Sequence, residues 1–93
     1  MIYEIKLHPG VAKYLKSLDS NTKARIKEGI DTLSDKPYPE NPRTDIKKLK
    51  GTKGRKSFYR LRIGNYRVIY TIEEETILVT DIIPREKGYK WLR

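Results

Sequence analysis

Residues 58–63 and 66–72 are two β-rich runs that are separated only by Gly64-Asn65. This arrangement restricts the folds open to the chain more than any other feature of the sequence. Tyrosine and isoleucine occur in both runs, and β-branched and aromatic runs bounded by turn residues are typical of strands. A two-residue connection that begins with glycine favours a type II′ β-hairpin. The chain is therefore expected to contain an antiparallel sheet built around this hairpin.

The short loop also predicts the register of the hairpin. Ile63 is expected to pair with Tyr66 and Arg62 with Arg67, because a two-residue loop fixes the register of the two strands that it joins. Side chains alternate between the faces of a strand, so Arg60, Arg62 and Arg67 share one face. The apolar members share the other, core-facing side: Tyr59, Leu61, Ile63, Tyr66, Val68, Tyr70 and Ile72.

Three arginines on one exposed sheet face predict a phosphate-binding platform. Like charges directly opposite each other destabilise a sheet, so stability alone does not favour Arg62 opposite Arg67. Each guanidinium offers a planar fork of donors that matches a phosphate group. The alternative is that Glu73, Glu74 or another acid neutralises the arginines. Those two glutamates lie at the far end of the hairpin, which favours the platform.

The first half of the chain reads as a strand followed by two helices. Residues 2–7 alternate polar and apolar side chains, which indicates a half-buried strand. Helices are expected over residues 9–18, with Pro9 in the first turn, and over about 20–34, with Asp19 or Ser20 as the N-cap. They should form an antiparallel hairpin. Apolar side chains recur at helical spacing along both segments: Val11, Tyr14, Leu15, Leu18, Ile26, Ile30 and Leu33.

The remaining segments complete an α+β domain over residues 1–93, with the order βααβββ. Three prolines predict a loop over 35–45, and residues 45–51 are expected to form a helical turn anchored by Ile46 and Leu49. A last strand is expected over 76–83, nearly continuous in apolar residues as if covered on both faces. The expected fold is an antiparallel meander with the helix hairpin packed on one face.

Composition narrows the function. The 93 residues carry a net charge of +9, which favours a polyanionic partner over a solvated, thermophile-like surface. Cysteine is absent and His8 is the one histidine, so cysteine nucleophiles and cysteine- or histidine-based metal sites have no support. No apolar run is long enough to span a membrane and no signal peptide is recognisable, so a soluble, cytoplasmic protein is expected.

Known catalytic motifs do not occur. There is no phosphate-binding loop, dinucleotide fingerprint or paired-carboxylate pattern, so no cofactor or metal is expected. Arg85 follows the last expected strand, and Tyr89 lies four residues further, one turn away if this tail is helical. A tyrosine beside arginines can act in proton transfer when positive charge lowers its pKa. The alternative assigns Tyr89 to packing of the tail.

The chain resembles the RelE/ParE toxin superfamily over essentially its whole length. The resemblance is carried by Leu49-Lys50-Gly51, Phe58-Tyr59-Arg60-Leu61-Arg62-Ile63-Gly64-Asn65-Tyr66-Arg67-Val68-Ile69-Tyr70 and Pro84-Arg85-Glu86-Lys87-Gly88-Tyr89. The resemblance implies a RelE-like fold and a toxin of a type II toxin–antitoxin system. RelE-type toxins cut mRNA in the ribosomal A site through attack of the ribose 2′-hydroxyl on the adjacent phosphate, without metal or cofactor. An antitoxin wraps such a toxin and neutralises it.

The resemblance also assigns roles to residues. It implies a catalytic set of Arg60, Arg62, Arg67, Arg85 and Tyr89, and an RNA-binding set of Lys47, Lys48, Lys50, Lys53 and Arg55. Arg60 and Arg62 stand where bacterial RelE enzymes have catalytic lysines, and arginine cannot act as a base in a protein. Many related nucleases also have a histidine just before the last arginine, where this chain has Pro84. Tyr89 is therefore the first choice for the base, with Lys47, Lys48 or Lys50 as the alternative.

Two other functions stay open. A ParE-like toxin would poison DNA gyrase through protein contacts, without catalysis. An inert RNA-binding module would need stacking aromatics on the basic face, and only Phe58 is expected there. The retained arginines and Tyr89 favour the mRNA endonuclease, whose antitoxin partner is expected to offer an acidic, amphipathic segment.

Overall fold

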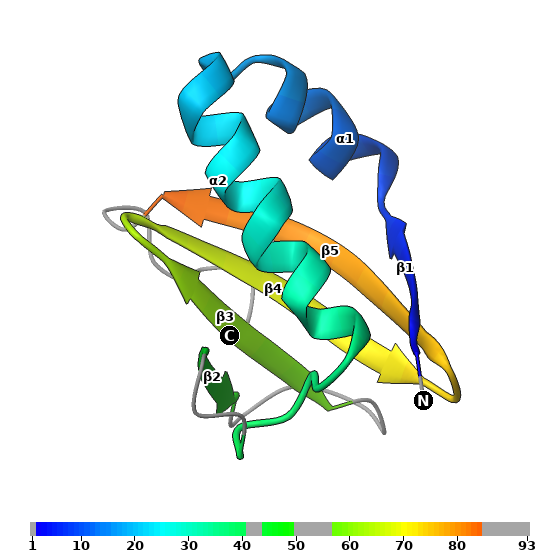
Figure 1. Ribbon diagram of the computed structural model, residues 1–93. Coiled ribbons are helices and arrows are strands. Elements are labelled where there is room, and N and C mark those ends of the chain that lie inside the picture. Colours follow the sequence, from blue (N-terminus) through cyan, green and yellow to red (C-terminus); the bar gives the residue numbers. More distant parts are fainter. Residues whose placement is uncertain (1, 41–43, 50–56, 85–93) are drawn as a thin grey trace.

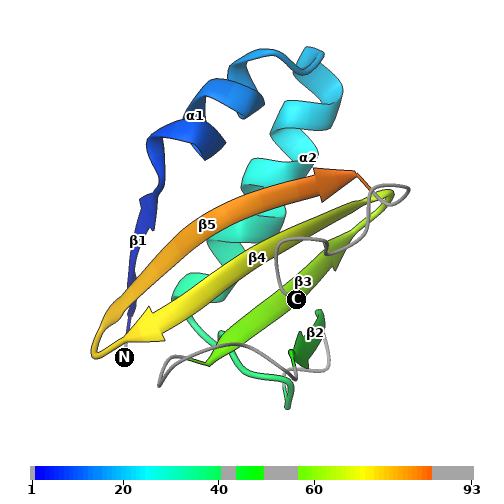
Figure 2. The same cartoon turned by 180° about the vertical axis from the view of Figure 1, so that it is seen from behind.

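The computed structural model describes residues 2–40, 44–49 and 57–84, and it contains two helices against a five-stranded sheet (Figure 1). The elements follow in the order β1 (Glu4–Leu7), α1 (Pro9–Lys16), α2 (Ser20–Asp31), a 3-10 turn η1 (Thr32–Ser34), β2 (Asp45–Lys48), β3 (Phe58–Ile63), β4 (Tyr66–Glu73) and β5 (Thr76–Pro84). Both helices lie on one side of the sheet, and the view from behind shows the strands in front of them (Figure 2). The expected α+β class with a helix hairpin on one face is confirmed.

The strand order across the sheet is β1-β5-β4-β3-β2. Strands β2 to β5 form an antiparallel meander. Strand β1 runs parallel to β5 and pairs with its first half, so that Glu4 stands opposite Thr76 and Leu7 opposite Val79. The first and last strands of the sheet in sequence are therefore neighbours, with the helix hairpin as the connection out of β1.

Local sequence signals explain both helices. Pro9 occupies the first turn of α1, where a missing N–H is no loss, and His8 Nδ1 accepts a hydrogen bond from Gly10 N at 3.1 Å. Asp19 caps α2, and its carboxylate accepts from Thr22 N at 3.0 Å. The expected helices are confirmed, although both end earlier than expected, at Lys16 and Asp31. Their apolar stripe, which Leu33 of η1 continues, is buried against the sheet: Val11, Leu15, Ile26 and Ile30.

The β3–β4 hairpin has the expected register. Ile63 pairs with Tyr66 and Arg62 with Arg67. Gly64 has a φ of +56°, and Asn65 is not among the described residues with positive φ, as a type II′ turn requires. The expected core-facing residues of both strands belong to or pack against the hydrophobic core.

Residues 45–48 form a strand and not the expected helical turn. In β2, Ile46 stands opposite Leu61 of β3 and is buried, whereas Asp45 and Lys47 on either side of it are exposed. This period of two matches a strand, and pairing with β3 satisfies backbone groups that would otherwise lie unpaired at the edge of the sheet. The expectation of a helical turn was therefore wrong, and the meander has four strands, one more than expected.

A tyrosine cluster closes the core beneath the proline-containing segment. Tyr70 is fully buried, and its hydroxyl donates to the Pro37 carbonyl oxygen at 2.7 Å. Burial raises the pKa of the Tyr70 hydroxyl far above its usual value. The Tyr70 ring stacks on Tyr59 with centroids 5.6 Å apart, and Tyr38 meets Tyr59 edge-on at 6.1 Å. These contacts hold the segment around Pro37 against the sheet.

Strand β5 is covered on both faces over part of its length, as expected. Ile77, Val79 and Ile82 belong to the core on the helix side. A register shift against Ile69 and Tyr70 leaves Thr80 as an extra residue of β5, and Ile83 is buried outside the main core cluster. Ile69 of β4 is also fully buried outside that cluster.

Candidate nucleic-acid interface

The sheet face turned away from the helices carries the arginines in two neighbouring rows. The register places Asp45, Arg62, Arg67 and Ile83 side by side across β2, β3, β4 and β5. The next row contains Lys47, Arg60, Ile69 and Asp81. We call this surface the arginine face; Figure 2 views the sheet from this side. The expected sharing of one face by Arg60, Arg62 and Arg67 therefore agrees with the register.

Arg60 is not an exposed member of this face, contrary to the expectation. It is 8% exposed, and its guanidinium Nη2 donates to Asp45 Oδ1 at 2.7 Å. Its Nε is buried and lacks a hydrogen-bond partner among the residues that the structure describes. A buried guanidinium needs a counter-charge, and Asp45 of the neighbouring strand supplies it. The acid that neutralises Arg60 is thus Asp45.

Arg62 and Arg67 form the accessible cationic pair. They stand directly opposite each other on β3 and β4; Arg62 is exposed and Arg67 is half-buried. Opposite residues of an antiparallel pair have Cβ atoms about 4.5–5.5 Å apart, so both guanidiniums can reach one anion. Asp45 stands opposite Arg62 in the register, but the ion pair that it makes is with Arg60. Within the described part of the chain, the Arg62 guanidinium has no hydrogen bond or ion pair.

Asp45 and Asp81 are the residues of this face that the sequence did not identify. Asp45 was placed at the end of a loop, although the polar-apolar-polar pattern of Asp45-Ile46-Lys47 is a strand signal. Asp81 stands opposite Ile69 on β5, and burial raises the pKa of its carboxyl. The hydrogen bond from Ile82 N to Oδ1, at 2.9 Å, and the nearby His8 lower the same pKa but do not offset burial.

The remaining predicted site residues divide into two groups. Lys47 stands opposite Arg60, and Lys48 stands opposite Tyr59 of the core-facing set, so the two lysines belong to different faces of the sheet. Both are exposed. The other predicted residues lie outside the described residues: Lys50, Lys53, Arg55, Arg85 and Tyr89.

The described residues contain neither a candidate metal cluster nor a membrane-spanning helix. Histidine, aspartate and glutamate side chains there do not form a group of three or more that could hold a metal ion. In the same part of the chain, neither α1 nor α2 nor any other helix has the length and apolar character needed to span a membrane.

Comparisons with known proteins agree on one family. Residues 5–89 match the family described as ParE toxin of type II toxin–antitoxin system, parDE. The chain is 37% identical over 92 residues to the RelE1 protein of Methanocaldococcus jannaschii, covering 97% of this chain and 98% of that protein. It is 30% identical over 79 residues to toxin RelE3 of the same organism, covering 85% and 86% of the two chains.

The fold comparison gives the same result. The archaeal RelE–RelB complex from Pyrococcus horikoshii OT3 contains a chain that is 34% identical, with a TM-score of 0.77 over 95% of this chain and 100% of that one. The family match covers more than half of the sequence, and the sheet and the helix hairpin are those of the matched fold. The chain belongs to the RelE/ParE family of toxins of type II toxin–antitoxin systems.

Proposed function

We propose that this toxin is a ribosome-dependent endoribonuclease of the RelE type. The ribose 2′-hydroxyl attacks the adjacent phosphorus, a bond forms between O2′ and phosphorus, and the bond from phosphorus to the 5′-oxygen of the next nucleotide breaks. The 2′-hydroxyl proton passes to a base, and the leaving oxygen takes up a proton. RelE toxins among the relatives support this reaction class.

The observation that carries the proposal is the Arg62–Arg67 pair on the arginine face. Asp45 binds Arg60 and leaves Arg62 without a counter-ion in the described part of the chain. Arg67 stands directly across from it. Two opposed guanidiniums on a rigid sheet are suited to hold one phosphate from two sides.

The chemistry of the reaction favours such a pair. Negative charge builds on the phosphate oxygens as the 2′-oxygen attacks, and fixed donors that face this charge stabilise the transition state. By analogy with oxyanion holes, a well-placed donor contributes roughly 3–4 kcal/mol. Alignment of the mRNA by the ribosome adds to this, because a positioned 2′-hydroxyl needs less activation by a base.

The other residues have supporting roles in the proposal. Arg60 is a positioning residue, since its pairing with Asp45 joins β2 to the arginine face and keeps that carboxylate away from Arg62. Arg85 remains a predicted phosphate ligand and Tyr89 the first choice for proton transfer. Exposed Lys47, which belongs to the arginine face, is the alternative base among the described lysines.

A RelB-type antitoxin is the proposed protein partner. Solved complexes of RelE with RelB include relatives of this chain. The net charge of +9 favours a partner with an acidic, amphipathic segment, because charge complementarity speeds encounter and excludes wrong partners.

The test is primer extension on an mRNA that is being translated in the presence of the purified protein. We expect cuts confined to A-site codons, and Arg62→Ala and Arg67→Ala should each reduce the cleavage rate by about 10²-fold or more, as loss of a transition-state donor does. The Arg62→Ala variant should keep the parent's stability, since removal of one member of a like-charged pair relieves repulsion. A folded double variant that still cuts at the parent's rate would contradict the proposal.

A second candidate is a ParE-like toxin that acts on DNA gyrase. The family description that matches residues 5–89 is that of ParE toxins, which favours this candidate. A supercoiling assay with purified gyrase separates the two functions. Inhibition of gyrase without cuts in translated mRNA would establish the second candidate.

A further inference from the structure

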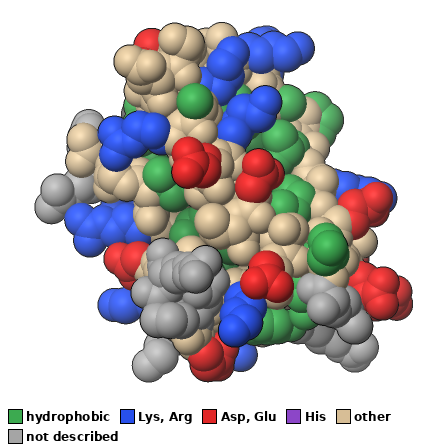
Figure 3. Space-filling view, in the orientation of Figure 1, with side chains coloured by type: hydrophobic (Ala, Val, Ile, Leu, Met, Phe, Trp, Pro, Cys, Tyr) green, Lys and Arg blue, Asp and Glu red, His purple; other side chains and the backbone are tan. Residues whose placement is uncertain are grey.

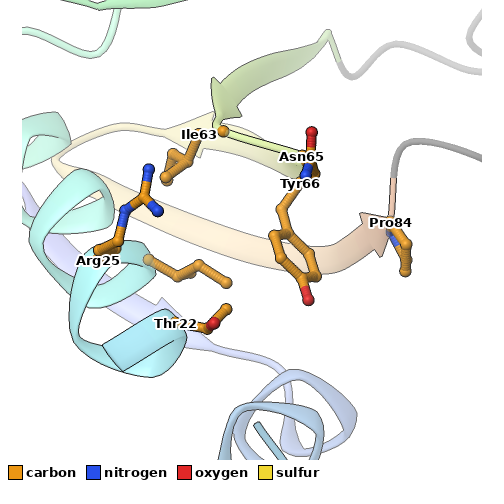
Figure 4. A pocket seen from close by; sticks show the side chains of 8 residues that line it. Thr22, Arg25, Ile63, Asn65, Tyr66 and Pro84 are labelled. Atoms are coloured by element: carbon orange, nitrogen blue, oxygen red, sulfur yellow. The ribbon is translucent and has the colours of Figure 1, made fainter. Parts of the chain in front are cut away.

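A cavity of about 520 Å³ lies on the helix side of the sheet, at the end where the β3–β4 hairpin turns (Figure 4). Four elements line it, since Thr22 and Arg25 come from α2, Ile63 from β3, Tyr66 from β4 and Pro84 from the end of β5. Figure 4 shows the Arg25 and Tyr66 side chains projecting into the same space from opposite walls. The arginine face is on the other side of the sheet, so this cavity is separate from the proposed catalytic surface.

The polar groups of the cavity are mostly unpaired. The side chains of Arg25, Asn65 and Tyr66 make no hydrogen bond or ion pair with any residue that the structure describes. A Cβ atom added to Gly64 would lie 3.4 Å from Arg25 Nη2, so the guanidinium rests against the hairpin turn. Thr22 is engaged, because its hydroxyl donates to Asp19 Oδ1 at 2.6 Å. That Asp19 carboxylate also accepts from Thr22 N and thus serves its own helix.

The rest of the wall is apolar. Ile26, Ile63, Pro84 and the Tyr66 ring supply this part of the lining. Ile26 is fully buried, whereas Ile63 and Tyr66 remain partly accessible. A cavity with unpaired donors and some apolar lining residues suits a side chain that is charged at its end and flanked by apolar neighbours.

We propose that this cavity binds a glutamate or aspartate side chain of an acidic, apolar protein segment. Arg25 provides the charge and a forked pair of donors for the carboxylate, and the Tyr66 hydroxyl and Asn65 amide add neutral donors. The apolar wall takes the residues that flank the acid.

The charge pattern of the cavity favours a protein over RNA. Arg25 is the one cation among the described lining residues, which matches a single carboxylate. RNA affinity depends on contacts with several successive phosphates. Figure 3 shows the helix side, where lysine and arginine side chains are interspersed with acidic ones and do not form an uninterrupted basic track.

Identification of the bound segment as part of the antitoxin rests on the proposed function. The preference of the cavity for a carboxylate is independent of the proposed function. A segment bound here would leave the arginine face open, so an antitoxin that also inhibits the proposed reaction would need a second contact on the far side of the sheet.

The test is an NMR titration of the full chain with the blocked tripeptide acetyl-Leu-Glu-Leu-amide. We expect saturable shifts of the backbone amides of Gly64 and Asn65. The glutamine counterpart of the peptide should bind about tenfold or more weakly, since it loses a charge-assisted hydrogen bond. Arg25→Ala should weaken binding of the glutamate peptide by a similar factor. The measurement needs no ribosome, so its result is independent of mRNA cleavage.

Lys27→Ala is the matched control, because it removes the same charge from an exposed position of the same helix outside the cavity. Binding by this variant should be unchanged. Equal affinity for the two peptides, or no saturable shift at Gly64 and Asn65, would overturn the proposal. Triuridylate is the third probe, and shifts of these amides by triuridylate but not by the glutamate peptide would assign the cavity to RNA.

Discussion

At the scale of single residues, the difference between Arg60 and Arg62 decides what the arginine face can do. The two side chains lie two positions apart on β3 and share a face, yet one is buried and the other exposed. Asp45 pairs with the buried one at 2.7 Å. Arg60 is thus a structural residue of the arginine face, whereas Arg62 is available to a ligand.

This division predicts unequal responses to substitution. Asp45→Ala should lower the free energy of unfolding by about 1–3 kcal/mol, because Arg60 would keep its charge without a counter-ion in a buried position. Arg60→Met should lower the free energy of unfolding by less, since it replaces a buried guanidinium with an apolar side chain of similar length. Urea unfolding measures both.

Glu28→Ala is the control, because it removes an exposed carboxylate from α2. It should change the free energy of unfolding by less than about 0.5 kcal/mol. An Asp45→Ala variant as stable as this control would show that the Arg60 charge does not depend on Asp45.

The sequence predicted part of this site, for a definite physical reason. A two-residue loop couples Arg62 to Arg67 locally, so their pairing follows from the turn alone. The burial of Arg60 depends on Asp45, which lies fifteen positions earlier and reaches β3 through a pairing that no local signal encodes. The alternation of side chains along β3 therefore predicts which arginines share a face, whereas pairing with β2 determines which of them remains accessible.

At the scale of elements, those that local sequence signals specify were predicted, whereas those that depend on pairing with distant residues were not. The helices and the β3–β4 hairpin follow from apolar spacing, caps and a turn within short stretches of chain. Strand β2 has only four residues and one buried apolar side chain, Ile46, so its pattern is too short to separate from a helical turn. The parallel placement of β1 beside β5 joins distant residues, and no local pattern specifies it.

The packing of α2 on β3 leads to a prediction about Gly29. A Cβ atom at this position would come within 2.9 Å of Ile63 Cγ1 and closer still to Cδ1, so Ile63 would have to move. Alanine improves helix propensity by about 1 kcal/mol, whereas overpacking costs typically 1–3 kcal/mol. Gly29→Ala should therefore lower the free energy of unfolding by roughly 1 kcal/mol in urea.

The double variant with Ile63→Val tests the cause. Valine lacks the Cδ1 atom that the new methyl group would meet. Gly29→Ala should therefore lower the free energy of unfolding by less in this background than in the parent. If the cost of the alanine is the same in both backgrounds, contact with Ile63 is not its origin.

At the scale of the whole molecule, net charge is the dominant property. A charge of +9 on 93 residues gives a long-range attraction for acidic partners that salt screens. We expect the association rate with the antitoxin to fall about tenfold or more when sodium chloride rises from about 0.05 to 0.5 M, with a smaller change in the dissociation rate. Stopped-flow measurements give both rates. An association rate independent of salt would mean that charge does not guide this encounter.

The parallel pairing of β1 with β5 has a consequence for how the protein is made. Glu4 pairs with Thr76, so the strand that leaves the ribosome first must wait for the strand that is made last in this sheet. Contacts between such distant residues form late, because a long loop has to close before they yield any stabilisation. A nascent chain that stops before β5 lacks the neighbour of β1 and one of the two neighbours of β4. The sheet that supports Arg62 and Arg67 is therefore completed only after β5 has been synthesised.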